Sequence, residues 1–358
     1  MRTEIALYLN GPKYSSAGAS GLVATAGALV VFGGAFVAPA VAATSARPST
    51  TVRIMLVPTR DAAGAILANS TREMERSAFL SSLAAAAASP AASFDNVSAK
   101  AFPAEERLCP GRLGVVAIDL QSGHRIFVRW TQRFPLASTF KLPLVMAVLS
   151  RVDRGAERLD RAIAYGRDAL LAYSPVTGLQ PHGGKLTVGA LCAAAIEHSD
   201  NTAANLLLGS VGGPAGVTRY VRGIGDALTR LDRTEPALNE AIPGDVRDST
   251  TPEAMANTLV RLLRDPILSA ASKETLFGWM RRAETGRSRI RAGVPASWTV
   301  GDKTGTTNTG ANDVAILWPP SGAPIVLAIY FAEVRGSDTS RDAVFAGVAR
   351  NVIRRFRA

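Results

Sequence analysis

The sequence predicts an α+β protein with one antiparallel sheet of about five strands, built from both ends of its folded part. Strand patterns with β-branched residues and turn signals occur near 113–131 and return at 298–333. Helical periodicity dominates the segment between them. With 358 residues, 47% of them hydrophobic, the chain can bury one large core or two small ones. We therefore expect terminal helices to cover the sheet and an all-helical insertion to lie beside it.

The first predicted elements are a hairpin and a helix. Leu113–Leu120 is apolar and β-branched, a Gln-Ser-Gly-His turn follows, and Arg125–Thr131 alternates as the return strand. Ser138–Arg151 then carries apolar side chains at helical spacing. Pro143 removes one backbone donor inside this helix, so its first turn is expected to be bent.

The segment 156–291 is expected to form the all-helical part. Five stretches in it have amphipathic spacing: Leu186–Glu197, Thr202–Leu208, Pro214–Ile224, Pro252–Arg264 and Ser272–Arg282. Leu231–Thr250 interrupts them with prolines, a glycine and many charges, and long irregular loops of this kind are usually functional.

The chain then returns to strands and ends in a helix. Strands are predicted at Trp298–Lys303, Asp313–Trp318 and Pro324–Glu333, followed by a helix at Asp338–Phe356. We therefore expect one domain over 98–357, in which 98–155 and 292–357 form the α/β part. A site is expected in the cleft between this part and 156–291.

Residues 1–97 contain two segments that resemble export signals. An uncharged run from Ser15 to Ala46 contains Ala40-Val41-Ala42, which is typical of a signal-peptide cleavage site. A second charged head, apolar body and small-residue tail begins at Met74. We hypothesise that Met74 is the true start, since folded-looking sequence begins only near Ala99. A native precursor whose intact mass includes Met1 would refute this. We expect 1–97 to be disordered and the mature protein to be exported, periplasmic or secreted, without stable membrane association.

The charge distribution argues against nucleic-acid binding, and the cysteines and histidines argue against a disulfide framework and a metal site. The net charge is +11, but the arginines are scattered in ones and twos without interleaved aromatics, so we expect no nucleic-acid partner. Cys109 and Cys192 are too few for a disulfide framework, although one bridge between them stays open. The three histidines lack ligand spacing, so neither a metal nor a cofactor is expected.

A serine and a lysine one helical turn apart form the first candidate for chemistry. In Ser138-Thr139-Phe140-Lys141 the two side chains share a helix face, where a base can take the hydroxyl proton. Such a string arises by chance about once in a chain of this length. It therefore needs support from elsewhere in the sequence.

Three further strings supply that support. Ser199-Asp200-Asn201 alone would be an ordinary helix cap, Lys303-Thr304-Gly305 a strand end, and Glu235 a solvated carboxylate in a loop. Taken together they add a second serine to move a proton, a second lysine to hold an anion, and a carboxylate to activate water. Their joint occurrence in this order indicates a serine acyl-transfer enzyme.

From about residue 98 to 357 the chain resembles the class A serine β-lactamases. The known catalytic motifs of that family are the Ser138, Ser199 and Lys303 strings together with the glutamate at 235. The likeness extends to Tyr173–Thr177, Leu231–Pro236 and Leu238–Pro243. It implies an α/β sandwich of the β-lactamase/transpeptidase type, a monomer, no cofactor, and a small-molecule β-lactam substrate. Penicillins or cephalosporins would be hydrolysed through an acyl-enzyme, which confers antibiotic resistance.

The resemblance also implies residue roles. Ser138 is the nucleophile, Ser199 protonates the leaving nitrogen, and Glu235 with Asn239 holds the deacylating water. Either Lys141 or Glu235 is the acylation base, and this stays open. Arg233 and Asp248 are expected to pair and close the loop. Substrate contacts are implied for Tyr173, Asn201, Asn239, Lys303, Thr304, Gly305 and Thr306.

One departure from the family pattern concerns the arginine that often follows the Lys-Thr-Gly strand. Thr306–Asp313 contains none. Arg289, before the strand, and Arg341, on the last helix, are the candidates to bind the substrate carboxylate, and we favour Arg289.

Two alternatives share the Ser-Lys core. A D-alanyl-D-alanine carboxypeptidase or transpeptidase acylates in the same way but generally lacks the Glu235 loop. A non-hydrolytic β-lactam sensor would need a membrane helix and a signalling domain.

Overall fold

The computed structural model describes residues 101–357. The predictions for residues 1–97, including the two export-like segments and the start at Met74, lie outside the described residues. Among the described residues, no helix combines the length and apolar character needed to cross a bilayer.

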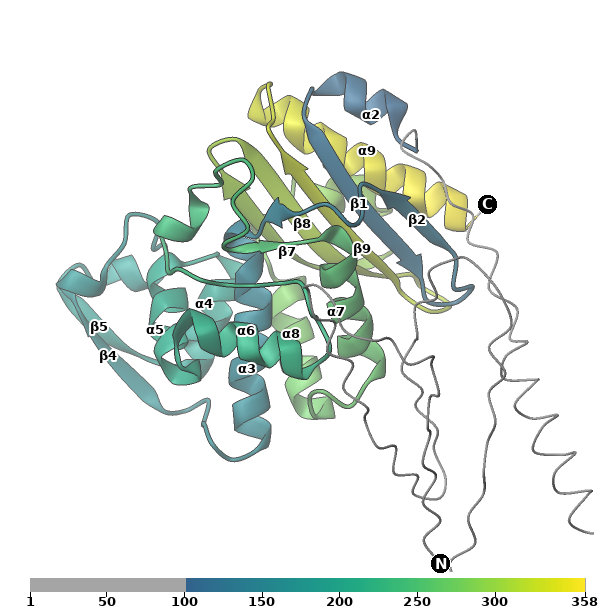
Figure 1. Cartoon of the computed structure of the whole chain (residues 1–358). Coiled ribbons are helices and arrows are strands. Elements are labelled where there is room, and N and C mark those ends of the chain that lie inside the picture. The colour runs from purple at the N-terminus through teal and green to yellow at the C-terminus, as the bar shows by residue number, and fades with distance from the viewer. Residues whose placement is uncertain (1–100, 358) are drawn as a thin grey trace, which may run out of the picture. The chain divides into compact units, whose positions relative to one another are not determined.

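A five-stranded antiparallel sheet joins both ends of the described chain (Figure 1). Its order is β2-β1-β9-β8-β7. The strands are β1 Arg112–Asp119, β2 Arg125–Val128, β7 Thr299–Thr307, β8 Gly310–Trp318 and β9 Ile325–Ala332. The predicted α+β class, with a sheet of about five strands from the two chain ends, is therefore confirmed.

Alternating apolar residues give the sheet two buried faces. On β9, Ile325, Leu327 and Ile329 pack in one core cluster, whereas Val326 and Ala328 pack in the other. Successive side chains of a strand point to opposite faces, and here both faces of the sheet are covered, so both sets are apolar. A cross-strand row on the second face runs from Val116 through Ala328 and Val314 to Lys303. Lys303 therefore shares the face that the helical part covers.

The first face is covered by the last helix, as expected. α9 (Asp338–Phe356) contributes Val344, Phe345 and Val348, and the short α2 (Pro103–Leu108) and the 3-10 turn η5 (Ile290–Gly293) pack beside it. Figure 1 shows α9 and α2 on the same side of the sheet. Sequence reasoning did not predict α2.

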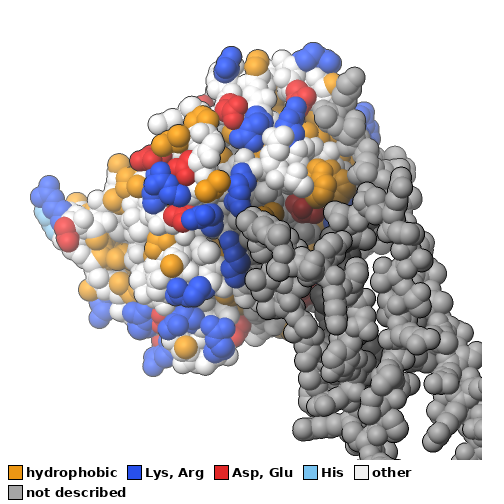
Figure 2. Space-filling model, in the orientation of Figure 1, with side chains coloured by type: hydrophobic (Ala, Val, Ile, Leu, Met, Phe, Trp, Pro, Cys, Tyr) orange, Lys and Arg blue, Asp and Glu red, His pale blue; other side chains and the backbone are white. Residues whose placement is uncertain are grey.

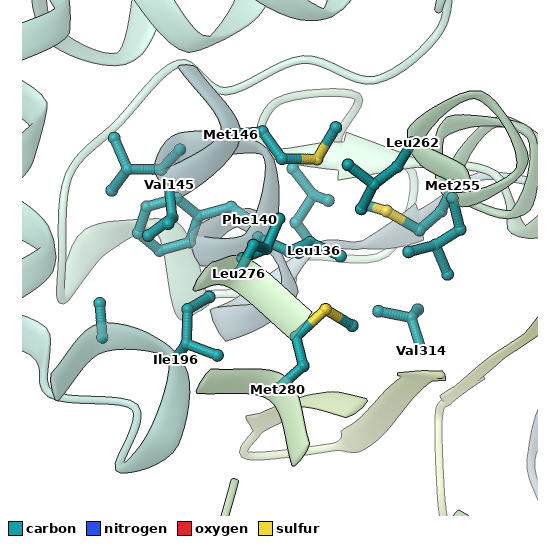
Figure 3. Close-up of a cluster of buried hydrophobic side chains, with 14 of the residues drawn as sticks. Leu136, Phe140, Val145, Met146, Ile196, Met255, Leu262, Leu276, Met280 and Val314 are labelled. Atoms are coloured by element: carbon teal, nitrogen blue, oxygen red, sulfur yellow. The ribbon is translucent and has the colours of Figure 1, made fainter. Parts of the chain in front are cut away.

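The helical part lies on the second face, and α7 (Pro252–Arg264) and α8 (Ala270–Arg281) contact the strands directly. The other helices of this part are α3 Lys141–Asp153, α4 Val188–Glu197, α5 Asn201–Val211 and α6 Gly213–Gly223. α3 packs against α4, α5, α6 and α8. Figure 3 shows Phe140 and Val145 among Ile196 of α4, Leu276 of α8 and Val314 of β8. The core between the sheet and the helices thus fixes the position of the first turn before α3.

The region 156–291 is not helical throughout, which corrects the expectation of an all-helical part. β4 (Ala162–Gly166) and β5 (Gly183–Thr187) form a two-stranded hairpin. Five of their ten residues are exposed and only Tyr165 is buried, so the alternation of Ile163 and Tyr165 in β4 is too short to mark a strand in the sequence. Gly183 has a φ of +98°, and a Cβ there would lie 2.3 Å from the Tyr165 carbonyl oxygen. Backbone pairing, not burial, defines this hairpin.

The remaining segments are short or irregular. β3 (Phe134–Pro135) pairs with β6 (Ser249–Thr250), and between them in sequence lie the 3-10 turns η1 Ala137–Phe140, η2 Arg167–Ala169, η3 Thr177–Leu179 and η4 Ala237–Asn239. Leu231–Thr250 is a long loop interrupted only by η4 and β6, as predicted.

The two cysteines do not form a disulfide bond with each other. Cys109 and Cys192 are both buried, in separate core clusters.

Candidate active site

Ser138 lies on the 3-10 turn η1, directly before α3. The turn begins at Ala137, whose φ is +42°, and packs against the end of β7. Gly305 of β7 permits this contact, because a Cβ there would lie 3.0 Å from the Ala137 Cβ and 3.2 Å from the Ser138 amide nitrogen. The predicted helix over 138–151 therefore begins as a 3-10 turn, upstream of Pro143.

Lys141 is fully buried and connects the serines of two segments. Its Nζ donates to Ser138 Oγ at 2.9 Å, to the Ser199 carbonyl at 2.7 Å and to Asn201 Oδ1 at 2.6 Å. It also lies 3.2 Å from Glu235 Oε1. One ammonium group thus links the candidate nucleophile to both the Ser199 segment and the loop carboxylate.

Ser199 lies between the two buried lysines. Its hydroxyl accepts from Lys303 Nζ at 3.0 Å and from Lys141 Nζ at 3.3 Å. Lys303 Nζ also donates to the Thr304 carbonyl at 2.7 Å. Ser199 has a φ of +59°, so the segment turns sharply before α5. The hydroxyl can therefore exchange a proton with either lysine.

Glu235 is held by hydrogen bonds to its backbone and its side chain. Its amide donates to Asn205 Oδ1 at 3.0 Å, and Asn205 Nδ2 donates back to its carbonyl at 2.9 Å. One carboxylate oxygen accepts from Ser138 Oγ at 3.4 Å, and the other accepts from Asn239 Nδ2. The carboxylate is 3% exposed and faces the serine, not bulk solvent.

Arg233 and Asp248 pair across the loop. Arg233 Nε donates to Asp248 Oδ2 at 2.6 Å. The same carboxylate accepts the backbone amides of Asp232 at 2.7 Å and Arg233 at 2.9 Å. Asp248 is 1% exposed and Arg233 more accessible. These bonds join the two ends of the loop that carries Glu235.

The two candidate arginines differ in their contacts. Arg289 is buried, and its Nη2 donates to Thr306 Oγ1 at 2.8 Å while its Nη1 donates to the Gly305 carbonyl at 2.9 Å. Arg341 contacts Asp338 and Asp342 on its own helix, α9. Only Arg289 of the two therefore reaches the Lys-Thr-Gly strand with a hydrogen bond.

Tyr173 and Asn201 form one wall of the site. The Asn201 amide donates to the Tyr173 carbonyl at 2.9 Å, and the Tyr173 ring is 53% exposed. Asp200 fixes this wall, because its carboxylate accepts the amides of Val176 at 2.9 Å, Thr177 at 2.8 Å and Ala203 at 2.8 Å. The string Ser199-Asp200-Asn201 thus caps α5 and also organises the cleft.

Burial changes the proton affinity of both lysines. Desolvation lowers the pKa of Lys141 below its ordinary value of 10.5, and the Glu235 carboxylate opposes that shift. Desolvation and then repulsion from Lys141 lower the pKa of Lys303 well below the same value. The buried carboxyl groups of Asp302 on β7 and Asp313 on β8 raise the pKa of Lys303 in opposition to these effects. Both ammonium groups are consequently closer to releasing a proton than solvated lysines.

Sequence reasoning assigned no role to three polar residues that support the site. Asn205 clamps the Glu235 backbone, and its position four residues after Asn201 on α5 was the available signal. Asn312 Nδ2 donates to the Leu136 carbonyl at 3.0 Å, which ties β8 to the segment before Ser138. Thr285 shares a hydrogen bond of 2.6 Å with Thr304. No sequence signal marked Asn312 or Thr285.

Comparison with known proteins places this geometry in a family. The profile of the Beta-lactamase enzyme family matches residues 98–356. The carbapenem-hydrolyzing beta-lactamase KPC of Klebsiella oxytoca is 45% identical over 262 residues, 73% of this chain and 89% of the relative. The chain belongs to the class A β-lactamases.

Solved structures of class A β-lactamases share its fold. The ancestral GNCA class A β-lactamase is 52% identical with a TM-score of 0.70, over 72% of this chain and 99% of that one. The putative class A β-lactamase PenP from Rhodopseudomonas palustris is 46% identical with a TM-score of 0.69, over 72% and 99%. The predicted resemblance to the class A family is thereby confirmed.

Proposed function

We propose that this class A β-lactamase hydrolyses the β-lactam ring of penicillins and cephalosporins through an ester at Ser138, and so confers resistance to them. The arrangement that supports this most is the short distance from Ser138 Oγ to two buried proton-transfer groups, 2.9 Å to Lys141 Nζ and 3.4 Å to Glu235 Oε1. A serine hydroxyl becomes a useful nucleophile when a positioned base takes its proton.

In acylation, Ser138 Oγ attacks the lactam carbonyl and loses its proton to the Lys141–Glu235 pair. The pair is joined at 3.2 Å, so either member can act as the base. The backbone amides of Ser138 and Thr306 are the donors assigned to the developing oxyanion, and one such donor lowers a barrier by about 3–4 kcal/mol in comparable sites. The carbon–nitrogen bond of the ring then breaks, and Ser199 protonates the nitrogen. Ser199 regains its proton from a neighbouring lysine.

In deacylation, a water molecule attacks the ester and gives its proton to Glu235. Glu235 Oε2 accepts from Asn239 Nδ2, and Asn239 Oδ1 is buried without a partner among the described residues. Asn239 can therefore accept a hydrogen bond from that water while Glu235 takes the proton. The ester bond then breaks, Ser138 Oγ takes a proton back from the Lys141–Glu235 pair to become a hydroxyl, and the open-ring acid leaves.

The peptidase alternative differs at this second step. A carboxypeptidase or transpeptidase would form the same ester but would lack a loop carboxylate near the nucleophile. The β-lactamase relatives at 45–52% identity do not favour that alternative.

The proposal is tested by measuring how fast the purified protein hydrolyses a penicillin, a cephalosporin and a carbapenem. Carbapenems are included because the Klebsiella relative is named for them. An adduct that forms without turnover on all three classes would contradict it.

We assign the substrate carboxylate to Lys303, Thr304, Thr306 and Arg289. Arg289→Ala is expected to raise KM for benzylpenicillin about 10- to 100-fold with a smaller change in kcat, because one charge-assisted contact is lost from the bound anion. Arg341→Ala is the matched control and should keep KM within about twofold of the parent. Steady-state kinetics measure both, and thermal unfolding checks that Arg289→Ala is folded. Equal KM changes in the two variants would refute the assignment.

The lowered pKa of Lys303 predicts an alkaline limit to activity. As pH rises through that pKa the ammonium becomes neutral, the anionic substrate binds less well, and kcat/KM falls at a pH below 10.5. In Lys303→Arg the guanidinium keeps its charge throughout, so this limb should move upward by about one pH unit or more. A pH profile of kcat/KM for a penicillin measures it. An unmoved limb would place the titration on another group.

We further propose that the mature protein is exported, does not associate stably with membrane and acts as a monomer. The export-like segments before the described residues support the first statement. Fractionation of the native host and the mass of the mature chain test the first two. Light scattering tests the third, and a concentration-independent dimer would contradict it.

A further inference from the structure

A groove of about 570 Å³ lies on the helical part, between the second half of α3, α6 and the segment before α8. Its apolar lining consists of Ala147, Val211, Gly216, Ile224 and Ile267. None of the residues assigned to catalysis or substrate binding lines it. Its volume falls within the range of small-molecule sites, about 300–1,000 Å³.

Three arginines, Arg151, Arg154 and Arg219, line the same groove. In the described part of the chain, none of them has a carboxylate oxygen within 4.0 Å. Arg158 and Arg161, close by in sequence, do have such partners. Figure 2 shows Lys and Arg side chains gathering near the lower end of α3 and beside α6. The groove therefore combines apolar walls with three arginines that have no ion-pair partner among the described residues.

The carboxylates nearest in sequence are engaged elsewhere. Asp153 accepts from the Ser269 amide at 2.7 Å, from Ser269 Oγ at 2.6 Å and from Ser272 Oγ at 2.7 Å. Glu157 accepts two bonds of 2.7 Å from Arg161. Asp153 still interacts with Arg154 through space, since that guanidinium lowers its pKa, but it forms no ion pair with any of the three groove arginines. Glu157 is paired with Arg161.

The groove residues also hold unused hydrogen-bond donors. Five buried side-chain atoms in the described chain lack a partner, and the two that can donate are Arg151 Nε and Tyr220 Oη, both on residues of this groove. Arg151 otherwise donates to the Ala156 carbonyl at 3.1 Å, and Arg154 to Ser150 Oγ at 2.8 Å. Arg151 Nε and Tyr220 Oη are themselves buried and out of reach of a groove ligand. A guanidinium has five N–H donors, however, so the three arginines keep other N–H groups for an acceptor.

Stabilisation of a helix C-terminus explains two of the three groove arginines but not the third. Arg151 lies in the last turn of α3 and Arg154 is its C-cap residue, where a cation favours the helix dipole. Arg219 lies before the last turn of α6, exposed at the groove edge. Its charge has no such explanation.

We propose that this groove binds an organic phosphate, with the phosphate on the three guanidinium groups and a short apolar body against Val211, Ile224 and Ile267. Guanidinium groups match phosphate oxygens in geometry and charge, which favours a phosphate over a neutral ligand. The apolar lining distinguishes an organic phosphate from the free ion. This proposal does not depend on the proposed hydrolysis.

Calorimetric titration of the full chain with phenyl phosphate, inorganic phosphate and benzyl alcohol tests it. Phenyl phosphate should bind at one equivalent, and inorganic phosphate about tenfold more weakly because it lacks the apolar body. Benzyl alcohol should show no binding. Affinity for phenyl phosphate should fall as salt rises from low to physiological concentration.

Variants locate the site. Arg151→Gln combined with Arg219→Gln should weaken phenyl phosphate binding at least about tenfold. Arg167→Gln removes an exposed arginine outside the groove and should bind like the parent. All variants should keep the parent unfolding temperature within a few degrees. Saturating phenyl phosphate should leave KM for benzylpenicillin unchanged.

Three outcomes would overturn the proposal. An affinity of the double variant equal to that of the parent would exclude these arginines. Equal binding of benzyl alcohol would exclude an anion site. Competition with benzylpenicillin would place the phosphate beside Lys303 instead.

Discussion

Ser138→Ala is expected to abolish the covalent adduct with penicillins and to lower kcat about 10⁴-fold or more. The hydroxyl is the only atom of the site to which both Lys141 and Glu235 contribute hydrogen bonds. An alanine side chain offers no atom to form the ester. Intact-mass spectrometry after brief mixing with benzylpenicillin, alongside steady-state kinetics, measures the result.

Ser150→Ala provides the control, because Ser150 lies on the same helix, α3, and within residues 101–357 its hydroxyl bonds to Arg154 alone. It should acylate and turn over like the parent. An adduct of unchanged mass shift in Ser138→Ala would move the nucleophile to another residue, with Ser199 the first to examine.

Glu235→Gln is expected to separate the two halves of the reaction. An amide cannot take a proton from water, so deacylation should slow about 10²- to 10⁴-fold. Acylation by benzylpenicillin should stay detectable if Lys141 can serve as its base. The acyl-enzyme should then accumulate, visible by mass spectrometry as a long-lived adduct and kinetically as a burst followed by slow turnover.

Glu240→Gln is the matched control in the same loop. Glu240 is exposed and pairs with Arg233, away from Ser138. Its variant should show parent turnover and no accumulated adduct. Parent-like turnover in Glu235→Gln would remove the water-activating role from Glu235. Loss of acylation as well would instead make Glu235 the base of both steps.

Burial decided which elements could be predicted. β1, β8 and β9 have apolar side chains on both faces, and their patterns were visible in the sequence. α7 and α9 begin after Thr251 and Ser337, whose hydroxyls accept amides of the first turn, and their predicted bounds were correct. The β4–β5 hairpin was missed because its apolar alternation is confined to Ile163 and Tyr165 of β4, of which only Tyr165 is buried.

The candidate site could be predicted as a set of residues but not as a geometry. The four strings identified Ser138, Lys141, Ser199 and Glu235 as residue types suited to acyl transfer. Asn205, Asn312 and Thr285 act through contacts distant in sequence, and no short string contains those pairs. The choice between Arg289 and Arg341 depends on which guanidinium reaches Thr306.

The amino-acid sequence by itself determined the periodicities, the caps and the kinds of reactive group, because these depend on neighbours within one or two turns. Only the tertiary structure decided that Lys303 faces the helices, since that follows from the register of β7 against β8. It likewise decided that Lys141 and Glu235, 94 residues apart, lie 3.2 Å from each other. Such pairs form when packing of the sheet and helices brings distant backbones together, and local patterns carry no record of that distance.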